Sequence, residues 1–267
     1  MIKVGFIGAG NMGGALAKAA AKAQCQLLIS DQDPKKAEIL SNEVDGKAVT
    51  NTEIAKTAKY IFLGVKPQVL PNVLAELSPI FAKRDDRFIL VTMAAGITTD
   101  SVEKMSGGKY PVIRIMPNTP AMIGKGMILY CCNDQVTNEE TDEFLKLIQN
   151  AGLAENLDEG LIDAGCAVSG CGPAFVYMFI EALAEGGVKS GLPKEKALRF
   201  AAQTVLGAGE MVLKTGKAPE ELKNAVCSPN GSTIEGVRHL EATDFKKEIH
   251  DTVAASFKRT VELGLGK

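Results

Sequence analysis

The chain has 267 residues, of which 46% are hydrophobic and 23% charged, a composition typical of a folded protein of one or two domains. Its net charge is −2 at pH 7 and no basic run occurs, so the charge pattern does not favour nucleic acid or an anionic membrane as a partner. The most apolar run, residues 174–180, ends at Glu181 and is too short to span a bilayer. Since the first residues already predict a strand, we expect no signal peptide and a cytoplasmic protein.

The chain holds six cysteines and two histidines. No two cysteines form a C-x-x-C pair, and two histidines add little to a zinc site, so we expect no metal. In a cytosolic protein, thiols stay reduced and behave as small buried hydrophobic side chains. We expect this of all six, namely Cys25, Cys131, Cys132, Cys166, Cys171 and Cys227.

A glycine-rich turn near the start of the chain is the strongest functional signal. Apolar residues at 2–7 predict a buried strand, and an alanine-rich stretch to Lys22 predicts a helix. The first glycine of the intervening motif allows a tight turn, the second leaves room for a pyrophosphate, and the third lets helix and strand pack closely. The helix start adds free N–H groups and a partial positive charge. We therefore predict a Rossmann-type dinucleotide site at Gly8, Ala9, Gly10, Asn11, Met12 and Gly13.

Strands and helices alternate through the N-terminal half. After the glycine turn the apolar pattern predicts strands at 25–30, 60–65, 88–92, 111–116 and 126–132, the last antiparallel at an edge, and a short strand at 154–157. Helices are predicted at 33–43 and 138–150. Such alternation implies right-handed crossovers and a doubly wound parallel sheet.

The pattern changes beyond residue 157, where helical spacing replaces strand patterns. Helices are predicted at 159–168, 173–190, 194–214, 219–226, 233–239 and 245–263. We therefore predict an α/β dinucleotide-binding domain over 1–157, followed by an all-α domain over 158–267.

Ligands of an open parallel sheet bind beyond the carboxyl ends of its strands. Small, proline and amide residues follow the predicted strands there, which suits a flat nicotinamide and its ribose. Asp31 would accept hydrogen bonds from the adenosine ribose and favour NAD. Lys35 and Lys36 either bind a 2′-phosphate or are solvated at a helix start, so the cofactor is NADPH or NADH.

Two loops of the C-terminal half could meet a second ligand. Residues 227–233 lead into a predicted helix, where backbone N–H groups could hold a small carboxylate; an ordinary N-cap turn explains the same residues. Residues 169–175 join two predicted helices, either as a tight turn or as a place where backbone approaches a ligand. His239 and His250 match no base–nucleophile pattern, and we expect them to be exposed or to cap helices.

Seven motifs in sequence order give the chain a family resemblance. They are Gly-Phe-Ile-Gly-Ala-Gly-Asn-Met at 5–12, Val-Lys-Pro at 65–67, Ala-Ala-Gly-Ile-Thr at 94–98, Arg-Ile-Met-Pro-Asn-Thr-Pro at 114–120, Asp-Ala at 163–164, Ser-Gly-Cys-Gly-Pro-Ala-Phe at 169–175 and Ser-Pro-Asn-Gly-Ser-Thr at 228–233. Over essentially its whole length the chain resembles pyrroline-5-carboxylate reductases. The last two motifs, in this order and spacing, are specific to that family.

The resemblance implies NAD(P)H-dependent reduction of 1-pyrroline-5-carboxylate to L-proline. It also implies a helical domain that builds a homodimer, with dimers assembled into a decamer. Substrate carboxylate would be bound by Gly231, Ser232 and Thr233, of which Thr233 reaches the ring nitrogen, and Glu159 would lie near the substrate. The positions that match cofactor contacts are Asn51, Val65, Lys66, Pro67, Ala94, Ala95 and Gly96.

Four positions depart from the family pattern. Asn230 stands for a usual glycine, Cys171 for a serine, Phe175 for a tyrosine, and Ala225 for an asparagine of some members. Asparagine tolerates the left-handed backbone better than most residues, so we expect the turn at Asn230 to survive. None of the four changes removes Thr233, and we expect the activity.

Thr233 is a weak acid, so we expect its hydroxyl to orient or relay a proton that solvent or an already protonated imine provides. Two alternative functions fit the residues less well. A β-hydroxyacid dehydrogenase begins with a similar glycine turn but needs a lysine on the long helix, where residues 173–188 have none. A non-catalytic nucleotide-sensing dimer would leave the two small-residue loops of the C-terminal half, at 169–175 and 227–233, without a ligand.

Overall fold

The computed structural model describes residues 1–264 and divides into two compact units. The first comprises Met1–Cys171 together with the end of the chain from Ser256, and the second comprises Gly172–Ala255. The first unit thus continues beyond the predicted division between residues 157 and 158, because Ile162 and Cys166 pack into its core.

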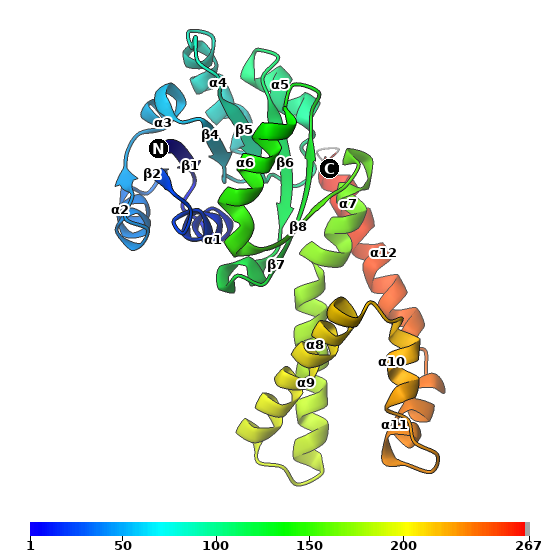
Figure 1. Ribbon diagram of the computed structural model, residues 1–267. Coiled ribbons are helices and arrows are strands. Elements are labelled where there is room, and N and C mark those ends of the chain that lie inside the picture. Colours follow the sequence, from blue (N-terminus) through cyan, green and yellow to red (C-terminus); the bar gives the residue numbers. More distant parts are fainter. Residues whose placement is uncertain (265–267) are drawn as a thin grey trace. The chain divides into compact units, whose positions relative to one another are not determined.

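The first unit is built on an eight-stranded sheet in the order β3-β2-β1-β4-β5-β6-β7-β8 (Figure 1). Every neighbouring pair from β3 to β6 is parallel, which confirms the predicted doubly wound α/β arrangement. The strands are β1 (Ile2–Ile7), β2 (Cys25–Ser30), β3 (Lys47–Ala48), β4 (Tyr60–Leu63), β5 (Ile89–Thr92), β6 (Val112–Pro117), β7 (Gly126–Cys132) and β8 (Gly152–Asn156).

The predicted strand at 126–132 is present as β7 and pairs antiparallel with β6. It is not the edge strand, because β8 pairs with its other side in parallel. β8 starts two residues before the predicted strand at 154–157. Its first residue, Gly152, has φ +145° and lies so close to Gly126 that a side chain there would collide with the backbone of β7.

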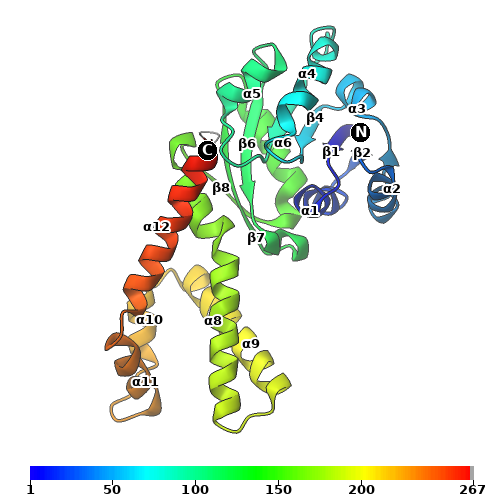
Figure 2. The ribbon, with the colours of Figure 1, turned by 180° about the vertical axis from the view of Figure 1, so that it is seen from behind.

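Helices cover both faces of the sheet, as the views from the front and from behind show (Figures 1 and 2). Side chains of a strand point alternately to opposite faces. Val4 and Phe6 therefore pack into one core, with α1, α2 and α6, while Ile7 packs into another, with α3, α4 and α5. These helices are α1 (Asn11–Ala20), α2 (Pro34–Glu43), α3 (Asn51–Thr57), α4 (Leu70–Phe81), α5 (Thr99–Ser106) and α6 (Asn138–Ile148).

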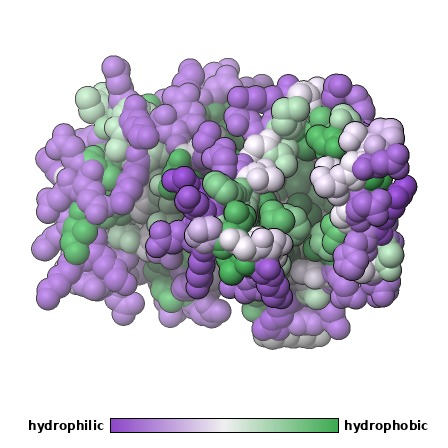
Figure 3. All heavy atoms as spheres, turned by 90° about the horizontal axis from the view of Figure 1, so that it is seen from below, coloured by the Kyte–Doolittle hydropathy of each residue, from purple (hydrophilic) through white to green (hydrophobic). Residues whose placement is uncertain are grey.

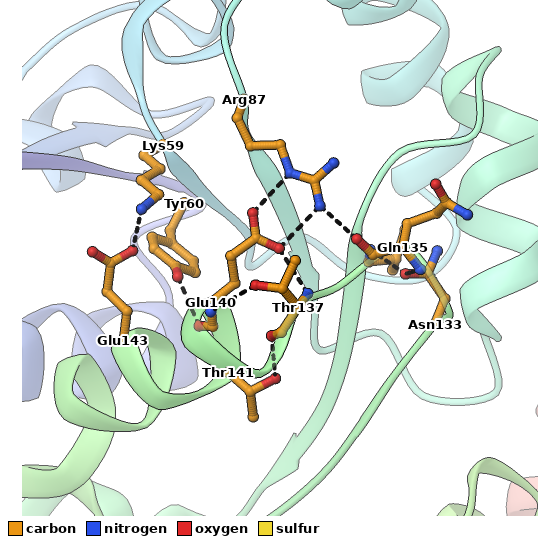
Figure 4. Close-up of polar contacts among 10 residues, drawn as sticks. Lys59, Tyr60, Arg87, Asn133, Gln135, Thr137, Glu140, Thr141 and Glu143 are labelled. Atoms are coloured by element: carbon orange, nitrogen blue, oxygen red, sulfur yellow. Dashed lines mark hydrogen bonds and ion pairs between the residues drawn. The ribbon is translucent and has the colours of Figure 1, made fainter.

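Polar contacts fix the start of α6 to the end of the sheet opposite the glycine turn (Figure 4). Both Glu140 carboxylate oxygens accept hydrogen bonds from Arg87, at 2.7 and 3.1 Å, and Thr137 completes a capping box with Glu140. The Tyr60 hydroxyl donates to the Glu140 carbonyl at 2.7 Å. Burial acts to raise the pKa of Glu140, but the bonds from Arg87 and the Thr137 N–H hold it below its usual value.

Residues 159–189 form one almost continuous helical stretch. It comprises a 3₁₀ turn (Glu159–Leu161), α7 (Ile162–Gly165), a π-helical turn (Cys166–Gly170) and α8 (Gly172–Lys189). The first of the two explanations for residues 169–175, a tight turn between two helices, is therefore wrong. The chain continues through a wider helical turn, in which the Cys171 N–H donates to the Cys166 carbonyl at 3.0 Å.

The second unit is helical, as predicted. Its helices are α8, α9 (Lys194–Thr215), α10 (Pro219–Ala225), α11 (Ser232–Glu241) and the first part of α12 (Phe245–Gly264). α8 and α9 pack through Ala184, Ala197 and Ala201, a small core for a unit of this size. Large apolar side chains are exposed in this part of the chain, including Met178, Leu206 and Leu213, and Figure 3 shows such side chains at the surface seen from below.

By length and composition alone, the stretch Glu159–Lys189 is long and apolar enough to cross a membrane, since an 18-residue window within it has a mean hydropathy of 1.5. It is longer than the apolar run recognised at 174–180, because the π turn joins two helices. Length and composition are weak indicators of a membrane span, since an apolar helix of a soluble protein passes the same test.

The six cysteines are all free thiols. Two of them, Cys131 and Cys166, are buried, and desolvation raises their pKa to about 12 and about 11 respectively. The expectation that all six are buried is wrong for the other four, which are half-buried. His239 and His250 are exposed, in line with one of the two expectations for them.

Candidate active site

The glycine turn after β1 has the geometry that its sequence predicts. Gly8 adopts φ +110°, a conformation that favours glycine, and its N–H donates to the Ser30 carbonyl at 2.7 Å. A Cβ on Gly13 would collide with the Gly8 carbonyl oxygen, whereas a Cβ on Gly10 would meet no atom within 4 Å. Gly10 is also the N-cap residue of α1, and no side chain caps that helix. Open space therefore lies beside Gly10, at the start of a helix whose first N–H groups no side chain caps.

Asp31 lies directly after β2 and is tied to the glycine turn. Its carboxylate accepts hydrogen bonds from the Ala9 N–H at 2.7 Å and from the Asp33 N–H at 2.9 Å. The hydroxyl of Ser30, the last residue of β2, donates to the side-chain oxygen of Asn51, the first residue of α3, at 2.6 Å. The structure thus brings three predicted residues, Ala9, Asp31 and Asn51, to neighbouring positions along the same edge of the sheet.

The remaining predicted cofactor residues follow the next two strands at this edge. Val65, Lys66 and Pro67 come after β4, and the loop of Ala94, Ala95 and Gly96 comes after β5. β1 and β4 are neighbours although β2 and β3 lie between them in sequence, so strand order reverses here. Gly8 and Gly64 touch across this point, since a Cβ on Gly8 would come within 2.5 Å of the Gly64 oxygen. Such a reversal point is where open α/β sheets bind dinucleotides.

A cavity of about 230 Å³ lies beside the glycine turn, between α1 and α2. Gly10 and Asn11 line it, together with Lys36 from α2 and Lys18 from α1. Lys18 is paired with Glu43 at 2.8 Å, whereas Lys35 does not line the cavity. Of the two lysines that could bind a 2′-phosphate, only Lys36 lines this cavity beside the turn.

A buried arginine near the loop after β5 was not recognised as a site residue from the sequence. Arg114 of β6 is 2% exposed, and its Nη2 lies 2.6 Å from Asp163 Oδ1 in α7. Its Nη1 lies 3.5 Å from Glu159, whose two carboxylate oxygens accept hydrogen bonds from the Thr99 N–H and hydroxyl. A charged residue within an apolar strand was the one available signal, because the partners of Arg114 lie 45 or more positions further along the chain.

The loop before α11 lies in the second unit and carries the predicted carboxylate site. Asn230 adopts φ +61°, as expected from its tolerance of the left-handed backbone, and the Gly231 N–H donates to the Ser228 carbonyl at 3.0 Å. Gly231 is the N-cap residue of α11, and neither Ser232 nor Thr233 caps the helix with its side chain. The N-cap explanation for these hydroxyls is therefore not supported, and the exposed Thr233 side chain is available to a ligand.

Among the described residues, 1–264, no three or more His, Cys, Asp or Glu side chains are grouped as metal ligands would be. The functional groups gathered in the first unit are backbone N–H groups, small side chains and the lysines beside the glycine turn. Such a set can hold a dinucleotide.

Two family models match parts of the chain. One described as pyrroline-5-carboxylate reductase dimerisation matches residues 159–263, and one described as NADP oxidoreductase, coenzyme F420-dependent, matches residues 3–96. Together they cover the helical part and the first five strands of the sheet.

Similar proteins extend over nearly the full length. Pyrroline-5-carboxylate reductase 3 of Danio rerio is 41% identical over 268 residues, covering 98% of this chain and 92% of that protein. Pyrroline-5-carboxylate reductase of Escherichia coli (strain K12) is 38% identical, covering 98% of each chain.

Solved structures agree in fold. The pyrroline-5-carboxylate reductase of Coxiella burnetii aligns with a TM-score of 0.90 at 28% identity, covering 97% of each chain. The pyrroline carboxylate reductase of Plasmodium falciparum, with NADP bound, aligns with a TM-score of 0.86 at 31% identity, covering 98% of each chain.

Proposed function

The chain belongs to the pyrroline-5-carboxylate reductase family, and on that premise we propose how its residues carry out the reaction. The protein reduces 1-pyrroline-5-carboxylate to L-proline with NAD(P)H. Family membership over the full length sets aside the β-hydroxyacid dehydrogenase and the nucleotide-sensing alternatives. What the residues do individually is the proposal.

The glycine turn is the proposed pyrophosphate site. A pyrophosphate would lie in the open space at Gly10, and because no side chain caps α1, its first backbone N–H groups are left to bind it. Asp31 and Asn51 would hold the adenosine side. Residues 65–67 and 94–96, on the other side of the strand-order reversal, would hold the nicotinamide side.

The start of α11 is the proposed substrate site. The first N–H groups of a helix have no partner within the helix, and no side chain caps α11. Gly231, Ser232 and Thr233 would therefore bind the substrate carboxylate through backbone N–H groups, with the helix dipole favouring the negative charge. This uncapped helix start is the observation that carries the proposal.

Thr233 is the proposed residue at the ring nitrogen. When bound, the nicotinamide supplies a hydride to the imine carbon, so the nitrogen must hold a proton. A threonine hydroxyl does not ionise near neutrality, so Thr233 would orient the ring nitrogen or relay a proton to it. Beyond this, the protein would hold the nicotinamide ring and the pyrroline ring in the orientation that hydride transfer requires.

Replacing Thr233 tests this assignment. Thr233→Ala should lower kcat/KM for 1-pyrroline-5-carboxylate about 10- to 100-fold, because the hydroxyl at the nitrogen is lost. Thr233→Ser, which keeps the hydroxyl, should stay within about threefold of the wild type. Steady-state kinetics at saturating NAD(P)H measure both variants, and an alanine variant with wild-type kcat and KM would remove Thr233 from the mechanism.

The helical part forms a homodimer, in accord with the dimerisation model that matches residues 159–263. We further propose that dimers assemble into a decamer, that the apolar stretch Glu159–Lys189 faces protein rather than lipid, and that the protein acts in the cytoplasm without nucleic-acid partners. The match to a dimerisation family over this stretch supports the second point. Light scattering after size-exclusion chromatography should give the decamer mass, and flotation with lipid vesicles should leave the protein unbound; monomeric protein or vesicle-bound protein would contradict the proposal.

A further inference from the structure

The loop that joins β5 to α5 is held by residues from well outside the sheet. It contains Ala94–Gly96, the segment proposed to contact the nicotinamide side of the cofactor, and ends at Thr99, the first residue of α5. Two residues from later parts of the chain reach it, Glu159 and Gly264. Both belong to the same compact unit as the loop.

Glu159 holds the end of this loop through two hydrogen bonds to one residue. Its Oε1 accepts from the Thr99 N–H at 2.8 Å, and its Oε2 accepts from the Thr99 hydroxyl at 2.9 Å. The bonded N–H is one of the first-turn donors of α5 that have no partner within the helix. Because a carboxylate at a helix N-terminus is also favoured by the helix dipole, this contact fixes both the position and the direction of α5.

Glu159 is itself held in place by a buried cation. Arg114 Nη1 lies 3.5 Å from Glu159 Oε1, and Arg114 Nη2 is bound to Asp163 at 2.6 Å. The arginine side chain is 2% exposed, so its charge is poorly screened by water and needs both carboxylates nearby. The chain of contacts thus runs from β6 through Glu159 to the loop after β5.

The middle of the loop is fixed by packing against the end of α12. Gly96 adopts φ +73°, and a Cβ there would lie 2.5 Å from Gly264 Cα. A Cβ on Gly264 would in turn lie 3.2 Å from the Gly96 oxygen. The two backbones therefore touch, and a loop so confined has little freedom to adjust to a ligand.

We propose that Glu159 is a positioning residue for the cofactor loop rather than a ligand of the substrate. The inference rests on the proposed function in one respect, the role of residues 94–96 at the cofactor. Both oxygens of Glu159 are already engaged by Thr99, and one of them also by Arg114. Without the hydrogen bonds between Glu159 and Thr99, α5 and the loop before it are no longer held in place. The affinity for the cofactor should therefore fall even when no substrate is present.

Two pairs of variants separate this role from substrate binding. Glu159→Gln removes the charge that Arg114 and α5 require, and Asp158→Asn removes the same charge from the exposed neighbouring residue as a control. Thr99→Val removes the hydroxyl with little change of shape, and Thr99→Ser keeps it. The Kd for NADPH is measured by fluorescence titration without substrate, and the KM for 1-pyrroline-5-carboxylate is measured at saturating NADPH.

We expect Glu159→Gln and Thr99→Val to raise the Kd for NADPH about 5- to 10-fold, with the KM for 1-pyrroline-5-carboxylate within about twofold of the wild type. Asp158→Asn and Thr99→Ser should leave both constants within about twofold. A raised KM for 1-pyrroline-5-carboxylate at unchanged Kd would make Glu159 a substrate ligand and overturn the inference, as would an unchanged Kd in both test variants. Wild-type protein that binds NADPH without reducing 1-pyrroline-5-carboxylate would refute the proposed function alone, since the titrations do not need turnover.

Discussion

Asp31 shows how one side chain can serve both the fold and the site. Its carboxylate was expected to meet the adenosine ribose, and the structure shows that it also accepts the N–H groups of Ala9 and Asp33. A carboxylate has about four acceptor positions, so two backbone bonds leave room for ribose hydroxyls. Asp31 therefore holds the glycine turn next to the position at which the ribose would bind.

At residue scale, we predict that Lys36 sets the preference between NADPH and NADH. This lysine lines the cavity beside Gly10 and Asn11, whereas Lys35 does not. Lys36→Ala should lower kcat/KM with NADPH about 5-fold and leave the value with NADH nearly unchanged, since NADPH alone carries the 2′-phosphate. Lys35→Ala is the matched control and should affect neither cofactor. Equal losses with both cofactors in Lys36→Ala would show that the lysine does not read the 2′-phosphate.

The residues that could be predicted are those whose role depends only on their neighbours in the sequence. Gly8 forms the predicted tight turn and Gly13 the predicted close contact between helix and strand, because a turn between strand and helix is a local structure. The Arg114 cluster could not be predicted, since Thr99 and Glu159 are 60 positions apart and meet because of the strand order. Pairing of this kind is set by topology, which single-sequence patterns do not reveal.

At the scale of elements, α6 depends on a charged pair at its N-terminus. Glu140 is nearly buried and accepts two hydrogen bonds from Arg87, whose side chain is half exposed. Glu140→Gln should lower the free energy of unfolding by about 1 to 2 kcal/mol at pH 7, with kcat unchanged, because the pair lies at the end of the sheet opposite the glycine turn.

The pH dependence of that loss follows from the direction of the pKa shift. The pKa of Glu140 is lowered in the folded state, so its stabilising contribution is present above the ordinary value of 4.5 and is lost as the pH falls below it. Denaturant unfolding of wild type and Glu140→Gln between pH 3 and 8 should therefore show curves that converge on the acid side. A difference that is constant across this range would mean that packing, and not the charge of Glu140, is responsible.

Several elements with a regular apolar pattern were predicted well, whereas the helices α3, α4 and α5 and the two-residue strand β3 were not predicted. β1, β7 and α9 lie within one residue of their predicted bounds because their apolar pattern is unbroken. A break is predicted at 169–172, because two glycines and a proline within residues 169–175 suggest a turn. This predicted break overlaps the end of the π turn at Cys166–Gly170. In the structure the wider turn accommodates these residues while the helix continues.

At the scale of the whole molecule, the two compact units differ in how much core they hold. The sheet-based unit has two large cores, while α8 and α9 share a small one and the helical unit exposes many large apolar side chains. Exposed apolar surface of this extent marks a protein interface, in agreement with the homodimer. The helical sequence predicted the fold class of this unit, but its sparse core follows from the need for a second chain, which sequence periodicity does not show.

The reduction of 1-pyrroline-5-carboxylate itself is the most direct test of the account. Nicotinamide absorbance would be followed with the purified wild-type protein and 1-pyrroline-5-carboxylate, using NADPH and NADH in parallel. The account predicts oxidation of the cofactor that depends on the substrate and yields one proline for each NAD(P)H consumed. Tight cofactor binding without substrate-dependent oxidation would contradict it.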